Sequence, residues 1–170
     1  MSAIIPPKPR VPTGGKLRIS IVAAKFNQEF TDALVENVVE EIEELATNAR
    51  VDLVRVPGAF EIPVTVKNLI EIEQPDCVIA LGCIIRGGTS HADLVATSVT
   101  EALQRIAVDT KTPVIHEVLL VEDEKQAYAR CIGTKLNRGR EAARSALDII
   151  ETMNEIRRAN QSLRLHPTNG

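Results

Sequence analysis

The residues of this chain that are best suited to chemistry lie close together, between Ala80 and Ala96. An apolar run leads into Gly87 and Gly88, and a helical pattern begins a few residues later. Two glycines allow the backbone to come close to a ligand, and the free N–H groups of a helix start point at it. We therefore predict that Gly87, Gly88 and Thr89 form a phosphate cradle, although a glycine pair at a strand end is often only a turn.

His91 adds an acid–base group to this loop. Ser90 and Asp93 have the spacing of a capping box, which makes Ser90 the expected first residue of a helix and puts His91 in the first turn. Histidine is the side chain best able to carry protons near pH 7. A phosphate cradle with a histidine beside it suggests an enzyme that acts on a small phosphorylated molecule.

The elements that must position these residues alternate regularly along the chain. Apolar runs predict four strands, and apolar residues at helical spacing predict a helix after each strand and one more at the end. This order is typical of the α/β class, here a three-layer α/β/α sandwich with a four-stranded parallel sheet. The expected strands cover residues 17–24, 51–56, 77–85 and 114–121.

Capping residues and prolines set the expected helix and domain boundaries. Five helices are expected. The first begins after a cap at Thr31 or Asp32, and the second leads from Phe60 to about Gln74. The third runs from His91 to about Val108, the fourth covers 124–131, and the fifth begins after a cap at Asn137. The chain then divides into an extended, proline-rich N-terminal arm (1–16), a single α/β domain (17–160) and a loose C-terminal tail (161–170).

In sheets of this kind, ligands bind at the carboxyl ends of the strands, and three of the four loops there hold unusual residues. The chain has three Phe, one Tyr and no Trp, so Phe26 at a strand end favours stacking on a flat ring over a place in the core. Glu61 closes the turn that begins at Gly58. A helix start welcomes a carboxylate in any protein, so Glu61 alone is a weak signal.

Other polar residues depend on their surroundings for a role. Arg130 and Lys135 flank Gly133, and a helix end favours such cations in any case. Arg130 belongs to the site only if it meets the glycine loop, which a neighbouring subunit could bring about. His116 and Glu117 interrupt a strand that would otherwise be apolar, so they face a subunit boundary or line a pocket.

Composition narrows the class of protein. With a formal net charge of -3 and no basic run, nucleic acid is not an expected partner. No apolar stretch approaches the roughly 20 residues of a membrane span, and the start of the chain does not resemble a secretory signal. Three cysteines without a CxxC motif indicate a reducing compartment, so we expect a cytoplasmic protein in which Cys77 and Cys83 are small buried hydrophobes.

Several collinear motifs together resemble the lumazine synthase family, which carries out the penultimate step of riboflavin biosynthesis. The resemblance runs from about Leu17 to Ile156 and implies a flavodoxin-like fold. It rests on Phe26-Asn27, PGAFEIP at 57–63, ALGCIIRGGTSH at 80–91, Pro113-Val114-Ile115, Gln126-Ala127 with Arg130, and Asn137 and Gly139 before Glu141-Ala142-Ala143.

The resemblance implies a reaction and a set of site residues. An amino-ribitylamino-uracil would condense with 3,4-dihydroxy-2-butanone 4-phosphate, without a metal or an organic cofactor. His91 would be catalytic and would move protons during imine formation and elimination. The pyrimidine and ribityl chain would be held by Phe26, Ala59, Phe60, Glu61, Cys83, Ile84, Ile85 and His116, and the phosphate by Gly88, Thr89, Arg130 and Lys135.

The resemblance also implies an assembly. Sites of the family lie between subunits, with Arg130 and residue 116 supplied by the neighbour. Members are pentamers, many of which close into 60-subunit icosahedral shells and can associate with riboflavin synthase. The segment from Arg130 to Asn137 has no insertion, which favours the shell. The N-terminal arm would add a strand to the adjacent subunit's sheet.

The chain departs from the family pattern at a few positions. Ala92 stands where an aromatic is usual, His116 stands for Phe and Glu117 for Gly, and Leu120-Val121 replace two threonines. The family lysine falls on Thr134 in an ungapped alignment, with Lys135 one place along. Ala92 and His116 keep open the alternative of a catalytically weak shell-forming or flavin-binding relative. A third alternative is a generic nucleotide-binding module of flavodoxin-like fold, which would be a monomer.

Overall fold

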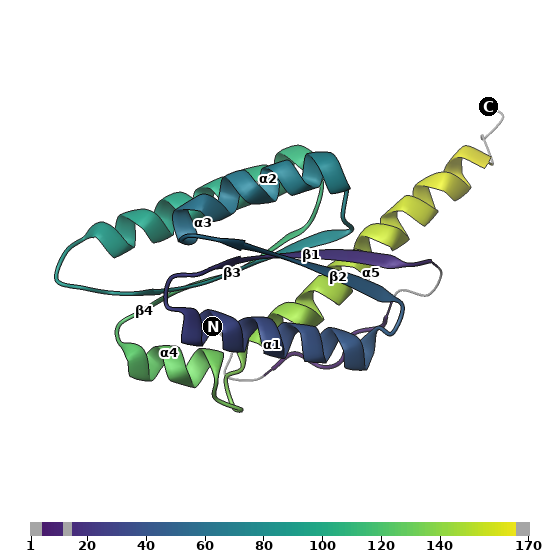
Figure 1. Cartoon of the computed structure of the whole chain (residues 1–170). Coiled ribbons are helices and arrows are strands. Elements are labelled where there is room, and N and C mark those ends of the chain that lie inside the picture. The colour runs from purple at the N-terminus through teal and green to yellow at the C-terminus, as the bar shows by residue number, and fades with distance from the viewer. Residues whose placement is uncertain (1–4, 12–14, 166–170) are drawn as a thin grey trace.

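Four parallel strands form the centre of the protein (Figure 1), seen in a computed structural model that describes residues 5–11 and 15–165. The strand order is β2-β1-β3-β4, so that β1 and β3 are central and β2 and β4 are edges. This arrangement confirms the predicted parallel sheet. The strands are β1 (Leu17–Ala24), β2 (Ala49–Val56), β3 (Cys77–Ile85) and β4 (Val114–Val121).

Helices cover both faces of the sheet (Figure 1), which confirms the three-layer sandwich. One face carries α1 (Gln28–Leu45), α4 (Glu124–Cys131) and α5 (Arg138–Leu165), and the other carries α2 (Ile62–Glu73) and α3 (His91–Thr110). Side chains alternate across a strand, and accordingly Ile21 packs with the first helix layer while Val22 packs with the second. The two apolar clusters fix the sheet between its helices, and the strand ends therefore hold the loops that follow them in defined positions.

The start of α1 differs from the prediction of a cap at Thr31 or Asp32. Asn27 is the N-cap in a left-handed conformation, with φ 54°, and its carbonyl accepts hydrogen bonds from the N–H groups of Phe30 and Thr31. Asparagine tolerates this conformation better than most residues, so the helix begins immediately after it. The early start leaves Phe26 as the last residue before the turn.

Smaller differences arise where pairing extends an element beyond its apolar run. Strand β2 begins at Ala49 rather than Val51, because Ala49 pairs with Leu17 of β1. Helix α3 reaches Thr110 rather than Val108 and ends at the left-handed residue Lys111. In contrast, Asn137 caps α5 as predicted, since its side chain accepts a hydrogen bond from the N–H of Arg140 at 3.0 Å.

Helix α5 is longer than its apolar pattern predicts. It continues to Leu165, so the expected tail at 161–170 is helical over 161–165, and residues 166–170 lie outside the described residues. Figure 1 shows its last turns extending away from the sheet. At its first turn, a Cβ on Gly139 would lie 2.6 Å from the Cβ of Asn37, so only glycine allows α1 and α5 to approach this closely.

The described part of the N-terminal arm packs on its own chain. Lys8 pairs with Glu44 at 2.5 Å, Arg144 donates to the carbonyl of Pro6, and Val11 packs against the larger apolar cluster. Residues 1–4 and 12–14 of the arm lie outside the described residues. Within the described part of the chain, none of the helices has the length and hydropathy needed to traverse a lipid bilayer.

Candidate active site

A hollow of about 310 Å³ opens at the carboxyl ends of the strands. It collects side chains from the β1 loop, the β2 loop, the end of β3 and the first turns of α3. Eight of the residues predicted from the sequence line it: Phe26, Ala59, Phe60, Glu61, Cys83, Ile84, Ile85 and His91. Parallel strands have their carboxyl ends at the same end of the sheet, so residues as far apart in the sequence as Phe26 and His91 line one hollow.

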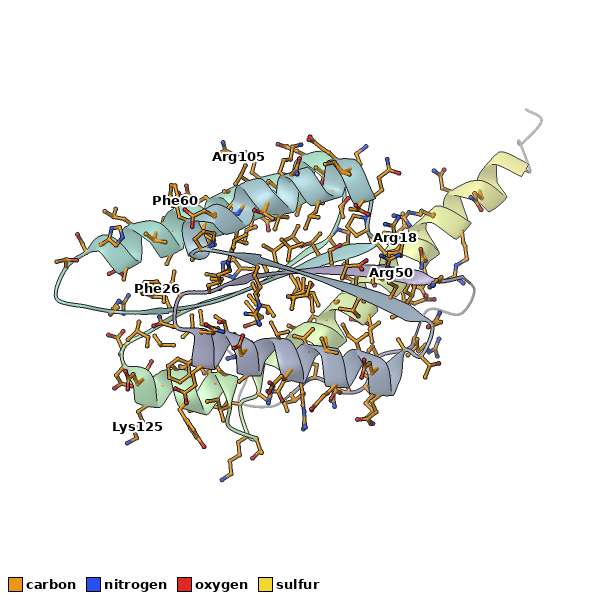
Figure 2. All side chains as sticks on the ribbon, in the orientation of Figure 1. Arg18, Phe26, Arg50, Phe60, Arg105 and Lys125 are labelled. Carbon is orange, nitrogen blue, oxygen red and sulfur yellow. The ribbon has the colours of Figure 1, made fainter. Side chains whose placement is uncertain are left out.

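Two exposed aromatic rings stand at this hollow. Phe26 is 73% exposed and Phe60 is 62% exposed, and Figure 2 shows both at the same end of the sheet. The interpretation of Phe26 as an ordinary core aromatic is therefore wrong. Exposure of two large apolar rings to water does not stabilise a single chain, so these rings are suited to contact a ligand or another copy.

Hydrogen bonds fix the two loops that carry these rings. The Asn27 side chain donates to the carbonyl of Cys83 at 2.7 Å, which ties the β1 loop to β3. The carboxylate of Glu61 accepts from the N–H of Gly58 at 2.9 Å, which closes the β2 loop. A short 3₁₀ turn (Ala59–Glu61) then leads directly into α2. Both loops are thus shaped before any ligand arrives.

The glycine loop is held by Arg86 instead of by the predicted capping box. Ser90 is the N-cap of α3, but its side chain makes no capping hydrogen bond. Asp93 pairs with Arg86 at 2.6 Å, and Arg86 also pairs with Glu122. The hydrogen bond from Arg86 lowers the pKa of Asp93. The guanidinium thus links the end of β3, the first turn of α3 and the loop after β4.

Replacing Arg86 by lysine is expected to loosen the loop at 86–91 without unfolding the domain. Exposed ion pairs contribute little to stability, so the free energy of unfolding should change little. Amide hydrogen exchange at residues 86–91 should become clearly faster. The control is Arg50→Lys, since Arg50 forms a comparable exposed pair with Asp52 on β2. Equal loop exchange in the two variants would remove Arg86 from this role.

Gly88 and Thr89 lie in the loop directly before α3, and His91 is the first residue of that helix. Gly88 and Thr89 are exposed in the loop, and a Cβ on Gly88 would meet no atom within 4 Å, so there is room for a ligand. The backbone N–H of His91 approaches the Thr89 hydroxyl at 3.4 Å. His91 is the first residue of α3 and lines the hollow. An anion beside Gly88 would therefore face a helix start and an acid–base group together.

The remaining predicted residues lie elsewhere in the chain. His116 and Arg130 line a second hollow of about 600 Å³, which shares no lining residue with the first. Lys135 is exposed in the segment between α4 and α5. A single chain therefore does not bring these three residues to the glycine loop.

The second hollow contains two titratable groups with altered pKa values. Burial raises the pKa of Glu117 to about 7, with a smaller opposing effect from Arg138. His116 is exposed on one side, but the protein atoms around its base remove water and lower the pKa of the ring. Both groups therefore favour their neutral forms.

Three residues that shape the two hollows or the glycine loop were not predicted as site residues. Asn27 had a signal, because asparagine directly after a strand often takes a left-handed turn. Arg86 also had one, since it directly precedes the glycine pair and has Asp93 seven residues on. Thr100, whose hydroxyl contacts His116, had none, because the contact depends on how α3 lies against β4.

The cysteines behave as buried apolar groups. Cys77, Cys83 and Cys131 are free and buried, which confirms the prediction for the first two. The hydrogen bond with Cys83 and burial raise the pKa of the Cys131 thiol. Among the described residues, no group of three or more His, Cys, Asp or Glu side chains is arranged to hold a metal ion.

Comparison with known proteins places this geometry in one family. A family model described as 6,7-dimethyl-8-ribityllumazine synthase matches residues 16–154. A protein of that name from Thermococcus kodakarensis is 40% identical over 144 residues, covering 85% of this chain and 91% of the relative. Another from Corynebacterium efficiens is 42% identical over 153 residues, covering 89% and 94%.

Proposed function

The chain belongs to the 6,7-dimethyl-8-ribityllumazine synthase family, and from that premise we propose that it is a transferase of riboflavin biosynthesis. Its reaction would condense 5-amino-6-(D-ribitylamino)uracil with 3,4-dihydroxy-2-butanone 4-phosphate. The amine attacks the ketone carbon to form an imine, phosphate is eliminated, and ring closure gives 6,7-dimethyl-8-ribityllumazine with release of water.

The observation that carries this proposal is the convergence of Phe26, Glu61 and His91 on one hollow. The exposed ring of Phe26 is suited to stack on the pyrimidine. Backbone groups of the β2 loop and of the end of β3 are suited to hydrogen-bond the uracil edge and the ribityl chain. The two substrates are reactive toward each other, so holding them side by side supplies much of the rate enhancement.

His91 is the proposed proton carrier of this site. Imine formation and elimination both require proton transfers at the reacting atoms, and a histidine at the hollow can serve both. Gly88 and Thr89 would hold the phosphate beside it. No other His side chain among the described residues lines this hollow.

Replacing His91 by alanine is expected to slow turnover only modestly, by roughly 10-fold in kcat, because orientation of the substrates persists. Steady-state kinetics with both substrates measures this. Ser90→Ala is a matched control, since the Ser90 side chain makes no capping hydrogen bond and its loss should leave kcat unchanged. Equal effects of the two substitutions would contradict the role given to His91.

We further propose that each complete site forms between two copies of the chain. The residues suited to the phosphate are divided between two places, with Thr89 in the exposed loop before His91, which lines the first hollow, and Arg130 at the second hollow. An adjacent copy would bring Arg130 and His116 to the first hollow. The proposed assembly is a homopentamer that closes into a 60-subunit icosahedral shell, with riboflavin synthase as a further partner.

A catalytically weak flavin-binding relative is the second candidate, and Ala92 and His116 are the residues that favour it. Mixing the purified chain with both substrates and following the absorbance of the lumazine separates the two. Product formation well above the spontaneous reaction is expected, whereas a rate equal to that background would leave only the binding protein. The three free, buried cysteines support a place in the reducing cytoplasm.

A further inference from the structure

Thr100 and His116 form a contact that lies outside every motif of the chain. Thr100 is on α3, His116 is on β4, and the Thr100 Oγ1 and His116 Nε2 atoms are 2.9 Å apart. Both side chains line the second hollow, together with Arg130. The contact therefore lies in the half of the site that an adjacent copy would complete.

The direction of this hydrogen bond follows from the bonds of the hydroxyl. Thr100 Oγ1 donates to the carbonyl of Ala96 at 2.8 Å, one turn earlier in the helix. A hydroxyl has a single hydrogen, so the bond to Ala96 leaves it only acceptor capacity toward the ring. His116 must then carry a proton on Nε2 and donate it to Thr100. The helix backbone thereby fixes the hydroxyl, and the hydroxyl fixes the ring.

The other groups around the hollow do not compete for this ring. Glu101 lines the hollow beside Thr100, and Glu117 and Arg130 line it from β4 and α4. Among the described residues, no hydrogen bond or ion pair joins any of these three to His116. Orientation of the imidazole therefore depends on the Thr100 hydroxyl.

We propose that Thr100 is a positioning residue: it accepts the Nε2–H of His116 and holds the imidazole in the orientation that stacks on the pyrimidine bound by the adjacent copy. This inference rests on the proposed function and on the site shared between copies. A phenylalanine needs no such partner, because its ring has no polar edge to satisfy. Histidine at this place needs one, because an imidazole that becomes covered without a hydrogen bond loses its contacts with water.

The contact is exposed in a single chain, where a hydrogen bond adds little because water competes for both groups. Covering by an adjacent copy would remove that competition. Loss of the hydroxyl is then expected to weaken binding of the pyrimidine substrate by roughly 3- to 10-fold, the range of one net hydrogen bond. Stacking acts on substrate and transition state alike, so KM should rise while kcat stays within about twofold.

The test compares Thr100→Val, which has nearly the same shape but no hydroxyl, with Thr100→Ser, which keeps it. We expect KM for the pyrimidine substrate to rise in Thr100→Val and to return to the wild-type value in Thr100→Ser. KM for the phosphate substrate should not change in either variant. Thr100→Ala should behave like Thr100→Val, and it keeps the test valid if valine disturbs assembly.

Two controls separate positioning from a structural effect. Thr152→Val removes a comparable hydroxyl bond to the carbonyl of Asp148 on α5, and should leave both KM values unchanged. In a His116→Phe background, Thr100→Val should have no effect. An undiminished KM rise in that background, a failure of serine to restore KM, or no KM change in Thr100→Val would each overturn the proposal. Absence of product from the wild-type protein would instead overturn the proposed function.

Discussion

Replacing Arg130 by alanine is expected to raise KM for the phosphate substrate roughly 10- to 100-fold, the size of one charge-assisted contact to phosphate. The structure leaves Arg130 available for this role. Among the described residues, its guanidinium donates hydrogen bonds only to Gln126, through two contacts of 3.4 Å. None of the described carboxylates pairs with it. An arginine that lines a hollow without a carboxylate partner is ready to take an anion.

Steady-state kinetics with each substrate varied in turn would measure this effect. KM for the pyrimidine substrate should change little, because only the phosphate loses a partner. Lys125→Ala is the matched control, since Lys125 is a cation on the same helix, α4, and points away from the molecule in Figure 2. An unchanged phosphate dependence in Arg130→Ala, or an equal change in Lys125→Ala, would remove Arg130 from the site.

Replacing Glu117 by glutamine is expected to stabilise the protein at pH 8 but not at pH 5. Burial raises the pKa of Glu117 from 4.5 to about 7. In that interval the folded state retains a proton that the unfolded state has released. Stability therefore falls as the pH rises from about 4.5 to about 7, and the loss is complete above that. The full shift corresponds to about 3 kcal/mol, at about 1.4 kcal/mol per tenfold change in proton binding.

Glutamine keeps the shape of this side chain and removes its titration. Urea unfolding at fixed protein concentration, at several values between pH 5 and pH 8, should show a steeper decline for the wild type than for Glu117→Gln. Glu155→Gln, which changes an exposed glutamate on α5, should follow the wild-type curve. Parallel curves for the wild type and Glu117→Gln would show that Glu117 is not held neutral by its surroundings.

The fold was predictable because its signals are local. The apolar runs 17–24 and 77–85 coincide with β1 and β3, since central parallel strands are buried on both faces. Boundaries set by tertiary partners were not predictable. Ala49 extends β2 only because it pairs with Leu17. Asp93 forms an ion pair with Arg86 instead of the predicted capping box.

The candidate site was predictable to the extent that topology alone creates it. Carboxyl ends of parallel strands share one edge, and this brings Phe26, Glu61 and His91 together whatever the packing details. Contacts between side chains of different elements could not be predicted in this way. Thr100 meets His116 through the register of α3 on β4, and no spacing along the chain encodes that register.

The most direct test of a catalytic site shared between copies is to mix two defective variants. Phe26→Ala with His91→Ala damages the first hollow, and Arg130→Ala damages the second. Both would be assayed alone and after coassembly, at phosphate-substrate concentrations far below the KM of the Arg130 variant. In a randomly mixed closed ring, about one interface in four receives two intact halves.

If the site is shared between copies, the coassembled mixture should recover about a quarter of the wild-type rate, from that fraction of intact interfaces, although each variant alone has a much lower rate. A mixture whose activity equals only the mean of the two separate variants would contradict a shared site. That result would show that the site is built within one chain.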